Sequence, residues 1–282
     1  MSHDLIHPTA IIDPTAKIGA GTTVGAYSII EKGVVVGEKN EIGPRVHIST
    51  GTTIGSHNHI HMGAVIGHIP QDLAYHGATS FTYIGDRNTI REYATIHRGT
   101  KENSATTIGN DNYLMAYSHV AHNCKIGNKV ILVNNASLTG YCEVGDGAFL
   151  SGFVGLHQFS KIGTMAIISA LTAVNKDIPP YMMAGGRPAV VQGINVIGLR
   201  RAGIPAEVRT EIKEAYKLLY KSGLNTTQAL EKIKGTLKSA QVNVLVEFIE
   251  TSDRGIAAGL GDEVETLLTK KGARASEEEE IF

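Results

Sequence analysis

Aliphatic residues recur at every sixth position through the first 174 residues of this 282-residue chain, with two interruptions. The series runs from Ile6 to Val174 and occupies 26 positions. A period of six fits neither the turn of an α-helix nor the alternation of a long strand, so each hexad must be a short strand followed by a corner. Three hexads make one triangular coil, and 26 hexads make nearly nine coils. The predicted fold is an all-β left-handed parallel β-helix.

Two columns of the repeat are predicted to point inward: the aliphatic positions and the mostly small residues two positions before them. Gly follows many of the aliphatic residues, as expected where a corner needs a conformation that is costly for other residues. Residues 18 apart should stack on neighbouring coils, because parallel strands lie about 4.8 Å apart. Cys124 and Cys142 form one such pair. Their spacing would tolerate a disulfide, but two cysteines in so long a chain favour a buried, reduced pair.

The repeat ends near Ile178, where Pro179-Pro180 and Gly185-Gly186-Arg187-Pro188 indicate a linker. Pro205 suits a first helical turn, and Gly223 suits a helix end. Three apolar sets at helical spacing follow: Val208, Ile212, Ala215, Tyr216 and Leu219; Leu230, Ile233 and Leu237; and Val242, Leu245, Val246 and Ile249. The expected division is a β-helix over residues 1–178 with loops at about 67–83 and 97–107, an α-helical domain over 190–254, and a flexible acidic tail over 255–282.

Composition and charge exclude several classes of partner. The 26 basic and 27 acidic residues leave a formal charge of −1, so there is no basic excess to bind nucleic acid. No stretch approaches the roughly 20 apolar residues of a membrane span, and the first ten residues lack the pattern of a secretory signal. The expected location is the cytoplasm.

Candidate chemistry centres on histidines that lie near the two interruptions. His97, His119, His122 and His157 all fall outside the inward columns, so they are expected to face outward. His122 should stack beneath Gly140, which has no side chain, with Gln158 two coils away at about 10 Å. This arrangement predicts a groove with a base at one end. A second run, His57, His59 and His61, could suggest a metal site, but a solvated face is the favoured interpretation.

Several motifs resemble those of a known enzyme family, the acyl-carrier-protein:UDP-N-acetylglucosamine O-acyltransferases, which begin lipid A assembly. The resemblance extends to about residue 250 and rests on H-x-x-H-[ND]-C, HQF and PP-Y motifs followed by a helical domain. The segments are IGHIPQDLAYHG (66–77), TIREYATIHRGT (89–100), SHVAHNCKIGN (118–128), GLHQF (155–159), DIPPYMMAGGRPA (177–189) and GINVIGLRRAGI (193–204).

The resemblance implies a role for each matching residue. His122 would be the general base and the backbone N–H of Gly140 the oxyanion donor. Ala170 would form the floor of the acyl groove and suggests a long or intermediate chain. The sugar and phosphate contacts would be Asp72, His97, His119, His157 and Gln158, and the nucleotide contacts Asn195 and Arg201. The resemblance further implies a homotrimer with sites between subunits, acyl carrier protein and UDP-N-acetylglucosamine as substrates, and neither cofactor nor metal.

The sequence departs from the family pattern at four positions: Asn123 replaces a frequent Asp, Ala74 a frequent Lys, Tyr141 a frequent His, and Ala202 a frequent Arg. A carboxylate partner for the base is therefore not assured, and nucleotide affinity is expected to be weaker or differently arranged. The acceptor atom is also left open, since a 3-hydroxyl and a 3-amino group would need the same base.

Three other functions fit less well. A zinc enzyme of the γ-carbonic-anhydrase type could use His97, His119 and His122, but its close pair is usually His-x4-His, whereas this chain has His-x2-His. The related N-acyltransferase of lipid A synthesis has an N-terminal domain for which a repeat that begins at Ile6 leaves no room. A purely structural β-helix should show plain repeats, which this chain interrupts twice.

Overall fold

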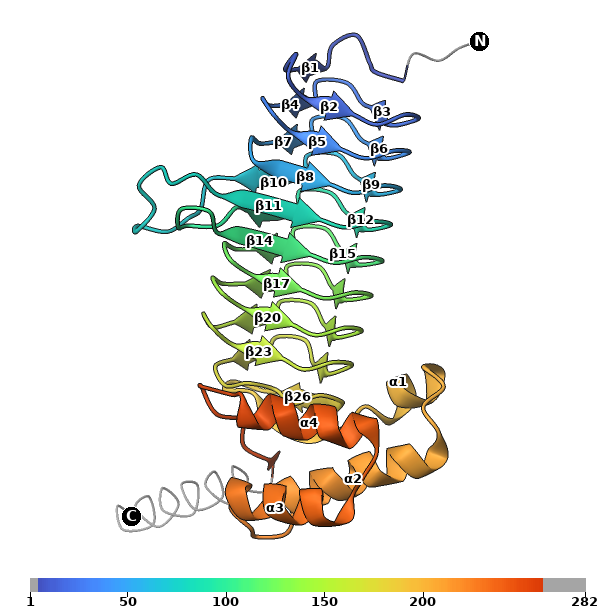
Figure 1. The fold of residues 1–282 in the computed structure, drawn as a ribbon, viewed down its shortest axis with the longest axis vertical. Coiled ribbons are helices and arrows are strands. Elements are labelled where there is room, and N and C mark those ends of the chain that lie inside the picture. The colour runs from blue at the N-terminus through green and yellow to red at the C-terminus, as the bar shows by residue number, and fades with distance from the viewer. Residues whose placement is uncertain (1–4, 261–282) are drawn as a thin grey trace, which may run out of the picture.

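The computed structural model describes residues 5–260, which form a triangular prism of stacked coils capped by helices (Figure 1). Within this range three sheets of parallel strands make the faces of the prism, as predicted for a left-handed parallel β-helix. The first face holds β1 (Ile11–Ile12), β4 (Ile29–Ile30), β7 (His47–Ile48), β10 (Val65–His68), β13 (Thr95–His97), β16 (His119–Val120), β19 (Ser137–Leu138), β22 (Gly155–Leu156) and β25 (Ala173–Val174).

The other two faces repeat the pattern. The second face holds β2 (Lys17–Ile18), β5 (Val35–Val36), β8 (Thr52–Ile54), β11 (Phe81–Ile84), β14 (Ala105–Ile108), β17 (Lys125–Ile126), β20 (Glu143–Val144) and β23 (Lys161–Ile162). The third holds β3 (Thr23–Val24), β6 (Glu41–Ile42), β9 (His59–Ile60), β12 (Thr89–Ile90), β15 (Tyr113–Leu114), β18 (Ile131–Leu132), β21 (Phe149–Leu150) and β24 (Ile167–Ile168). We call the corner between the first and second faces the first corner, that between the second and third faces the second corner, and the remaining one the third corner.

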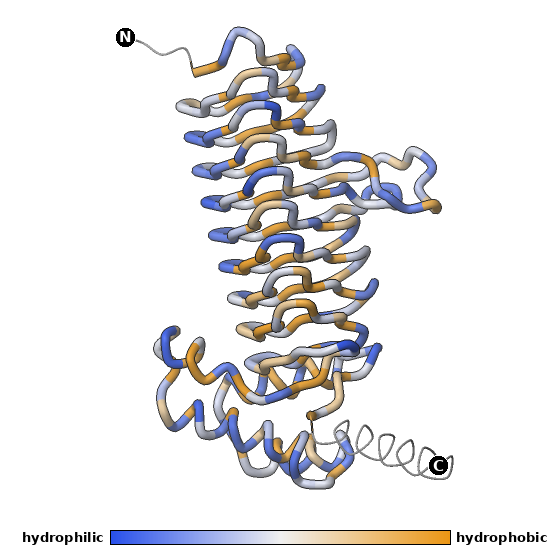
Figure 2. Tube along the Cα trace, turned by 180° about the vertical axis from the view of Figure 1, so that it is seen from behind, coloured by the Kyte–Doolittle hydropathy of each residue, from blue (hydrophilic) through white to orange (hydrophobic). Residues whose placement is uncertain are grey.

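The core lies along the axis of the prism and consists of the two columns predicted to point inward. Residues such as Ile48, Ile90 and Leu132 are fully buried. Hydrophobic residues stack in columns along the strands, while hydrophilic residues gather at the corners (Figure 2). Cys124 and Cys142 are buried and free, as the sequence predicts, and each thiol lies within hydrogen-bond distance of a backbone carbonyl.

The glycines that follow many of the aliphatic residues are needed for a different reason from the one expected. Gly19 does not adopt a left-handed conformation; instead, a Cβ there would lie 2.4 Å from the backbone of Gly37 on the next coil. The left-handed residue comes two positions later and is often not glycine, as at Tyr27 and Asn123, with φ of 58° and 59°. The repeat therefore needs glycine for close approach between coils.

Two loops leave the prism at the first corner, on neighbouring coils (Figure 1). The first excursion, residues 69–80, joins β10 to β11, and the second excursion, residues 98–104, joins β13 to β14. Both are shorter than expected because the flanking strands extend beyond the usual two residues. They contact each other: the backbone N–H of Thr79 donates to Glu102, and that of Asn103 donates to the carbonyl of Thr79.

The segment expected to be a linker is instead part of a sheet. Strand β26 (Met182–Gly185) pairs with β24, and β27 (Val190–Ile194) returns antiparallel to β26. The prolines and glycines that indicated a linker therefore serve a hairpin that closes the end of the prism. The helical region then begins later than residue 190.

Four helices complete the described chain: α1 (Val196–Arg201), α2 (Ala206–Tyr220), α3 (Thr226–Thr236) and α4 (Ala240–Glu250). The predicted apolar sets lie on the last three helices, except that Leu237 is the C-cap of α3, and Gly223 follows α2 with φ of +72°. Helix α1 was not predicted; Asn195 caps its N-terminus by accepting from the backbone N–H of Gly198. None of these helices, within residues 5–260, combines the length and apolarity needed to cross a bilayer.

The chain after α4 does not leave the fold at Gly255 as expected. Ile256 bridges to Asp177 and Gly259 bridges to Val191, and Ala257 is buried between these contacts. The expected tail therefore starts later than Gly255, because residues 255–260 add backbone hydrogen bonds to the capped end. The remainder of the tail, residues 261–282, lies outside the described residues.

Candidate active site

His122 lies at the first corner, between β16 and β17, beside the first excursion. It lines a pocket of about 500 Å³ together with residues from both the prism and the excursion. These residues are Gln71, Asp72, Leu73, His119, Ala121, Thr139, Gly140 and Gln158. The pocket therefore brings together five of the residues predicted for the site.

Gly140 stacks directly on His122, as the spacing of 18 predicts. A Cβ at Gly140 would lie 2.2 Å from Cε1 of His122 and 2.5 Å from its Nε2, so no side chain can be accommodated there. Within residues 5–260 no acceptor takes the backbone N–H of Gly140. The imidazole thus faces a bare segment of backbone with an available donor.

The two nitrogens of His122 have different surroundings. Nδ1 lies 3.0 Å from Oδ1 of Asn123, and Nε2 lies 3.4 Å from Oδ2 of Asp72 on the first excursion. The side chain is only about 7% exposed. One edge of the ring is therefore held by the corner, while the other edge faces a carboxylate and the pocket.

His97, which is buried, and His119, which is partly buried, form a pair beside the base. Their rings meet edge to face with centroids 4.9 Å apart, and Nδ1 of His119 lies 2.7 Å from Oγ1 of Thr95. Burial, reinforced by His119 and two other histidines, lowers the pKa of His97 to about 4, and burial also lowers the pKa of His119. Both rings are therefore neutral near pH 7.

Facing outward from the prism does not mean exposure to solvent for two of the four histidines. His97 and His122 point away from the axis of the prism, but only 5% and 6% of their surfaces are exposed. The repeat phase reports the direction of a side chain relative to the prism, and it does not report cover by an excursion. His157 is exposed, with Nδ1 3.1 Å from the carbonyl of Gln158, and it does not line the pocket.

The residues assigned to the nucleotide lie at a different corner of the same chain. Asn195 and Arg201 line a groove of about 820 Å³ at the second corner, beside α1. The amide of Asn195 is already engaged: it caps α1 and donates to the carbonyl of Met165 at 2.8 Å. A single chain does not bring these two residues to His122.

Ala170 lies exposed at the third corner, across the first face from His122. It is one coil from Gly152, as predicted, because the N–H of Leu171 donates to the carbonyl of Gly152. The outward positions of the first face between these corners carry Ser137, Gly155 and Ala173. Small side chains therefore floor the path from the pocket to Ala170.

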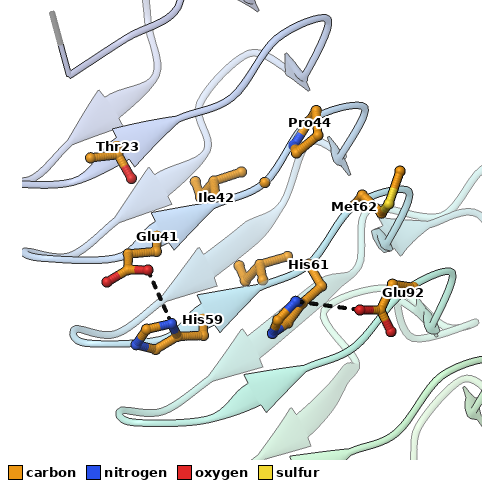
Figure 3. Close-up of a pocket in the computed structure, with 10 residues that line it drawn as sticks. Thr23, Glu41, Ile42, Pro44, His59, His61, Met62 and Glu92 are labelled. Carbon is orange, nitrogen blue, oxygen red and sulfur yellow. Dashed lines mark ion pairs between the residues drawn. The ribbon is translucent and has the colours of Figure 1, made fainter. Parts of the chain in front are cut away.

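The run of histidines that suggested a metal is dispersed. On the third face, His59 pairs with Glu41 at 3.2 Å and His61 pairs with Glu92 at 3.5 Å, as separate contacts (Figure 3). His57 occupies a left-handed corner position instead of the strand. Across residues 5–260 there is no group of three or more His, Cys, Asp or Glu side chains placed to share a metal ion.

Sequence reasoning missed Thr100, which lies in the second excursion and contacts Asn123. The N–H and the hydroxyl of Thr100 both donate to Oδ1 of Asn123, at 3.0 and 2.9 Å. The departure from the family pattern at Asn123 was the only signal in the sequence. An amide beside the base needs other hydrogen-bond partners than a carboxylate, and Thr100 is one of them. The lining residues Gln71 and Leu73 were also missed, because the first excursion carries no periodicity. Ala121 and Thr139, which directly precede His122 and Gly140 at the corner of the prism, were missed as well.

Comparison with known proteins agrees with the motifs. A family model described as UDP N-acetylglucosamine O-acyltransferase, domain 2, matches residues 177–257, and a bacterial transferase hexapeptide model matches residues 33–68 and 105–140. An acyl-(acyl-carrier-protein)–UDP-N-acetylglucosamine O-acyltransferase of Herminiimonas arsenicoxydans is 44% identical over 258 residues, which cover 89% of this chain and 98% of that protein. The chain belongs to this acyltransferase family.

Solved structures of the acyltransferase family share the whole architecture. The UDP-N-acetylglucosamine acyltransferase of Francisella novicida is 41% identical and superposes with a TM-score of 0.88, covering 90% of this chain and 94% of that one. The enzyme from Bacteroides fragilis is 43% identical with a TM-score of 0.87, covering 89% and 98%. The β-helix with C-terminal helices is therefore the fold of the family, as predicted.

Proposed function

We propose that this acyltransferase transfers a 3-hydroxyacyl chain from acyl carrier protein to position 3 of UDP-N-acetylglucosamine, the first step of lipid A biosynthesis. The donor and acceptor come from the names of the related enzymes. The observation that carries the proposal is the contact of His122 with Gly140, which sets a base beside a free backbone donor inside one pocket. Acyl transfer requires a base at the attacking hydroxyl and a hydrogen-bond donor at the oxygen of the carbonyl that is attacked.

His122 acts on the acceptor hydroxyl. A neutral imidazole, the form suited to a base near pH 7, takes the hydroxyl proton as the oxygen attacks the thioester carbonyl. The N–H of Gly140 donates to the tetrahedral oxyanion that forms. Collapse breaks the carbon–sulfur bond, and the imidazolium returns its proton to the departing thiolate. Asp72, 3.4 Å from Nε2, stabilises the imidazolium between these steps.

The remaining pocket residues hold the acceptor. Asp72, His119 and Gln158 line the pocket and offer hydrogen bonds to the sugar and the phosphates. His97 supports His119 through its ring contact, and His157 stands at the exposed side beside Gln158. Neutral histidines suit this task because each can donate one N–H and accept at the other nitrogen.

A homotrimer would complete the nucleotide subsite. Asn195 and Arg201 lie at the second corner, so they reach a nucleotide bound near His122 only if a neighbouring copy presents its second corner to the first corner of this one. Leu73, at the tip of the first excursion, is fully exposed in the single chain, as expected of a side chain that packs against a neighbour. Asn195 would act mainly by positioning α1.

The proposed reaction needs neither cofactor nor metal, because a thioester is already activated and no metal-bound water takes part. The nucleotide sugar and the carrier-protein thioester are consistent with the cytoplasmic location that we propose. Elemental analysis of active enzyme provides the check. Stoichiometric zinc whose removal abolishes activity would overturn this part of the proposal and favour a zinc enzyme.

The decisive experiment offers the protein UDP-N-acetylglucosamine or its 3-amino analogue, with a set of acyl-carrier-protein thioesters, and weighs the products. The expected result is a UDP-N-acetylglucosamine product heavier by one 3-hydroxyacyl group. A product formed from the 3-amino sugar alone would revise the acceptor. The absence of acylated sugar with every donor would overturn the proposed function.

A further inference from the structure

The side chain behind the base is an amide held by three hydrogen bonds. Asn123 is 9% exposed, and its Oδ1 lies 3.0 Å from the N–H of Thr100, 2.9 Å from the hydroxyl of Thr100 and 3.0 Å from Nδ1 of His122. Thr100 belongs to the second excursion, so the excursion contacts the base through Asn123. Asn123 and Thr100 do not line the pocket themselves.

Donor and acceptor rules assign every proton in this cluster. A backbone N–H can only donate, so the atom of Asn123 that faces Thr100 must be the amide oxygen. An amide oxygen can only accept, so Nδ1 of His122 must carry a hydrogen. The lone pair of the neutral imidazole is then on Nε2, the nitrogen that faces Asp72 and Gly140.

Tyr141 extends the cluster by one hydrogen bond. The single hydrogen of the Thr100 hydroxyl is directed to Asn123, so the Tyr141 hydroxyl, 3.1 Å away, must donate to Thr100. The Tyr141 ring also packs edge to face on His122, with centroids 5.4 Å apart. The result is a directed chain from Tyr141 through Thr100 to Asn123, with His122 donating to the same oxygen.

We propose that Asn123, Thr100 and Tyr141 are positioning residues that hold His122 as its Nδ1–H tautomer without a charged group on that nitrogen. This inference rests on the proposed function and deepens it. An amide fixes the tautomer as a carboxylate would, but it does not stabilise the imidazolium by charge. Asp72, on the opposite nitrogen, then supplies the only nearby charge among the contacts described for His122.

Replacing Asn123 with Asp separates orientation from charge. Asn123→Asp keeps an oxygen for all three donors and adds a negative charge on the Nδ1 side. We expect the acidic limb of the pH profile of kcat/KM to move to higher pH by about one unit, because the charge favours the imidazolium. Asn103→Asp is the matched control: Asn103 is exposed, has φ of 56° against 59° for Asn123, and should leave the limb in place.

Three further variants remove the cluster in steps. Asn123→Ala should lower kcat about 10- to 100-fold with the KM for UDP-N-acetylglucosamine within about twofold, a range typical when a partner that orients a functional histidine is lost. Thr100→Val keeps the backbone donor and should lower kcat about 3- to 10-fold, and Tyr141→Phe about twofold. A solely structural role would instead change thermal stability with no shift of the pH profile in Asn123→Asp.

The tautomer itself can be read without activity. Two-dimensional ¹H–¹⁵N spectra of the histidine rings, assigned with a His122→Gln variant, should show Nδ1 of His122 protonated and Nε2 unprotonated at neutral pH in the wild type. A protonated Nε2, or an unmoved acidic limb in Asn123→Asp, would overturn the inference. If His122→Gln retained full activity, the proposed function of the base would fail as well; if only Asn123→Ala did, the inference alone would fail.

Discussion

Two corners of the same prism treat polar side chains in opposite ways. At the second corner the inward column carries Asn40, Asn58, Asn88 and Asn112, and each amide oxygen accepts from the next coil. At the first corner the corresponding inward positions carry hydroxyl and thiol side chains, among them Thr82, Thr106, Cys124 and Cys142, which form no such amide ladder. The polar residues of the candidate site, such as His122, lie outside this column and beneath the excursions. Polar groups that satisfy one another stabilise the scaffold, and polar groups left facing a pocket remain available to a substrate.

Removing the base at the first corner should produce the largest effect, and it should change catalysis and leave stability unchanged. His122→Ala is expected to lower kcat by about 10²-fold or more, the range that loss of a general base produces. The side chain lies outside the core columns, so the melting temperature should change little. Steady-state rates with an acyl-carrier-protein donor measure the first quantity. His59→Ala, on the third face, is the control, and a near-wild-type rate in His122→Ala would refute the mechanism.

Breaking the ladder of stacked asparagine amides at the second corner should lower stability and leave kcat unchanged. Asn88→Ala leaves the N–H of Asn112 and the carbonyl of Gly109 without their partners in a buried corner. Each unsatisfied group costs about 1–3 kcal/mol, so the free energy of unfolding should fall by about 2–4 kcal/mol. Urea unfolding measures it, with Asn175→Ala, an exposed position without a left-handed backbone, as reference. Equal stability of the two variants would contradict the distinction between the corners, as would a selective loss of kcat in folded Asn88→Ala.

The third corner provides a smaller effect, on selectivity alone. Ala170→Met should obstruct the far end of the path floored by small residues on the first face. Overpacking a fitted site typically costs about 1–3 kcal/mol, or roughly 5- to 150-fold in preference toward shorter acyl donors. Competition assays with mixed donors measure the shift, and the KM for the nucleotide sugar serves as internal control. An unchanged preferred length would show that Ala170 does not limit the chain.

The smallest expected effect concerns stability in acid. Burial lowers the pKa of His97 to about 4 from an unfolded value near 6.5, so the unfolded chain binds a proton first as the pH falls. The stability due to neutral His97 is therefore present above about pH 6.5 and is lost between pH 6.5 and 4. His97→Gln should show a shallower fall in melting temperature over this window, by about 2 °C or more. Parallel curves for the two proteins would contradict the assignment.

The β-helix could be predicted because one rule, a period of six, applies to every coil. The stack of Gly140 on His122 followed from that rule by adding 18. What the rule could not predict lies where the chain departs from it. The hairpin of β26 and β27 resembles a linker in sequence, because turns and linkers use the same prolines and glycines.

The candidate site was likewise predictable where it follows the repeat and not where it depends on the excursions. The column assignment placed His97 outside the prism, but its burial depends on cover that periodicity does not describe. Thr100 reaches Asn123 only through the path of the second excursion. Asn195 and Arg201 were assigned to the same site as His122 through resemblance alone. They lie apart from it because they line the groove at the second corner, whereas His122 lines the pocket at the first.

The closing hairpin bears on how such a molecule remains a discrete particle. A stack of parallel coils has no inherent end, since the last coil presents a row of unpaired backbone groups on which another molecule could continue the sheet, as in a fibril. Strand β27 reverses direction against β26, and α2 packs against β27. The C-terminal segment therefore covers that end, so resistance to end-to-end association depends on the last third of the chain as much as on the repeat.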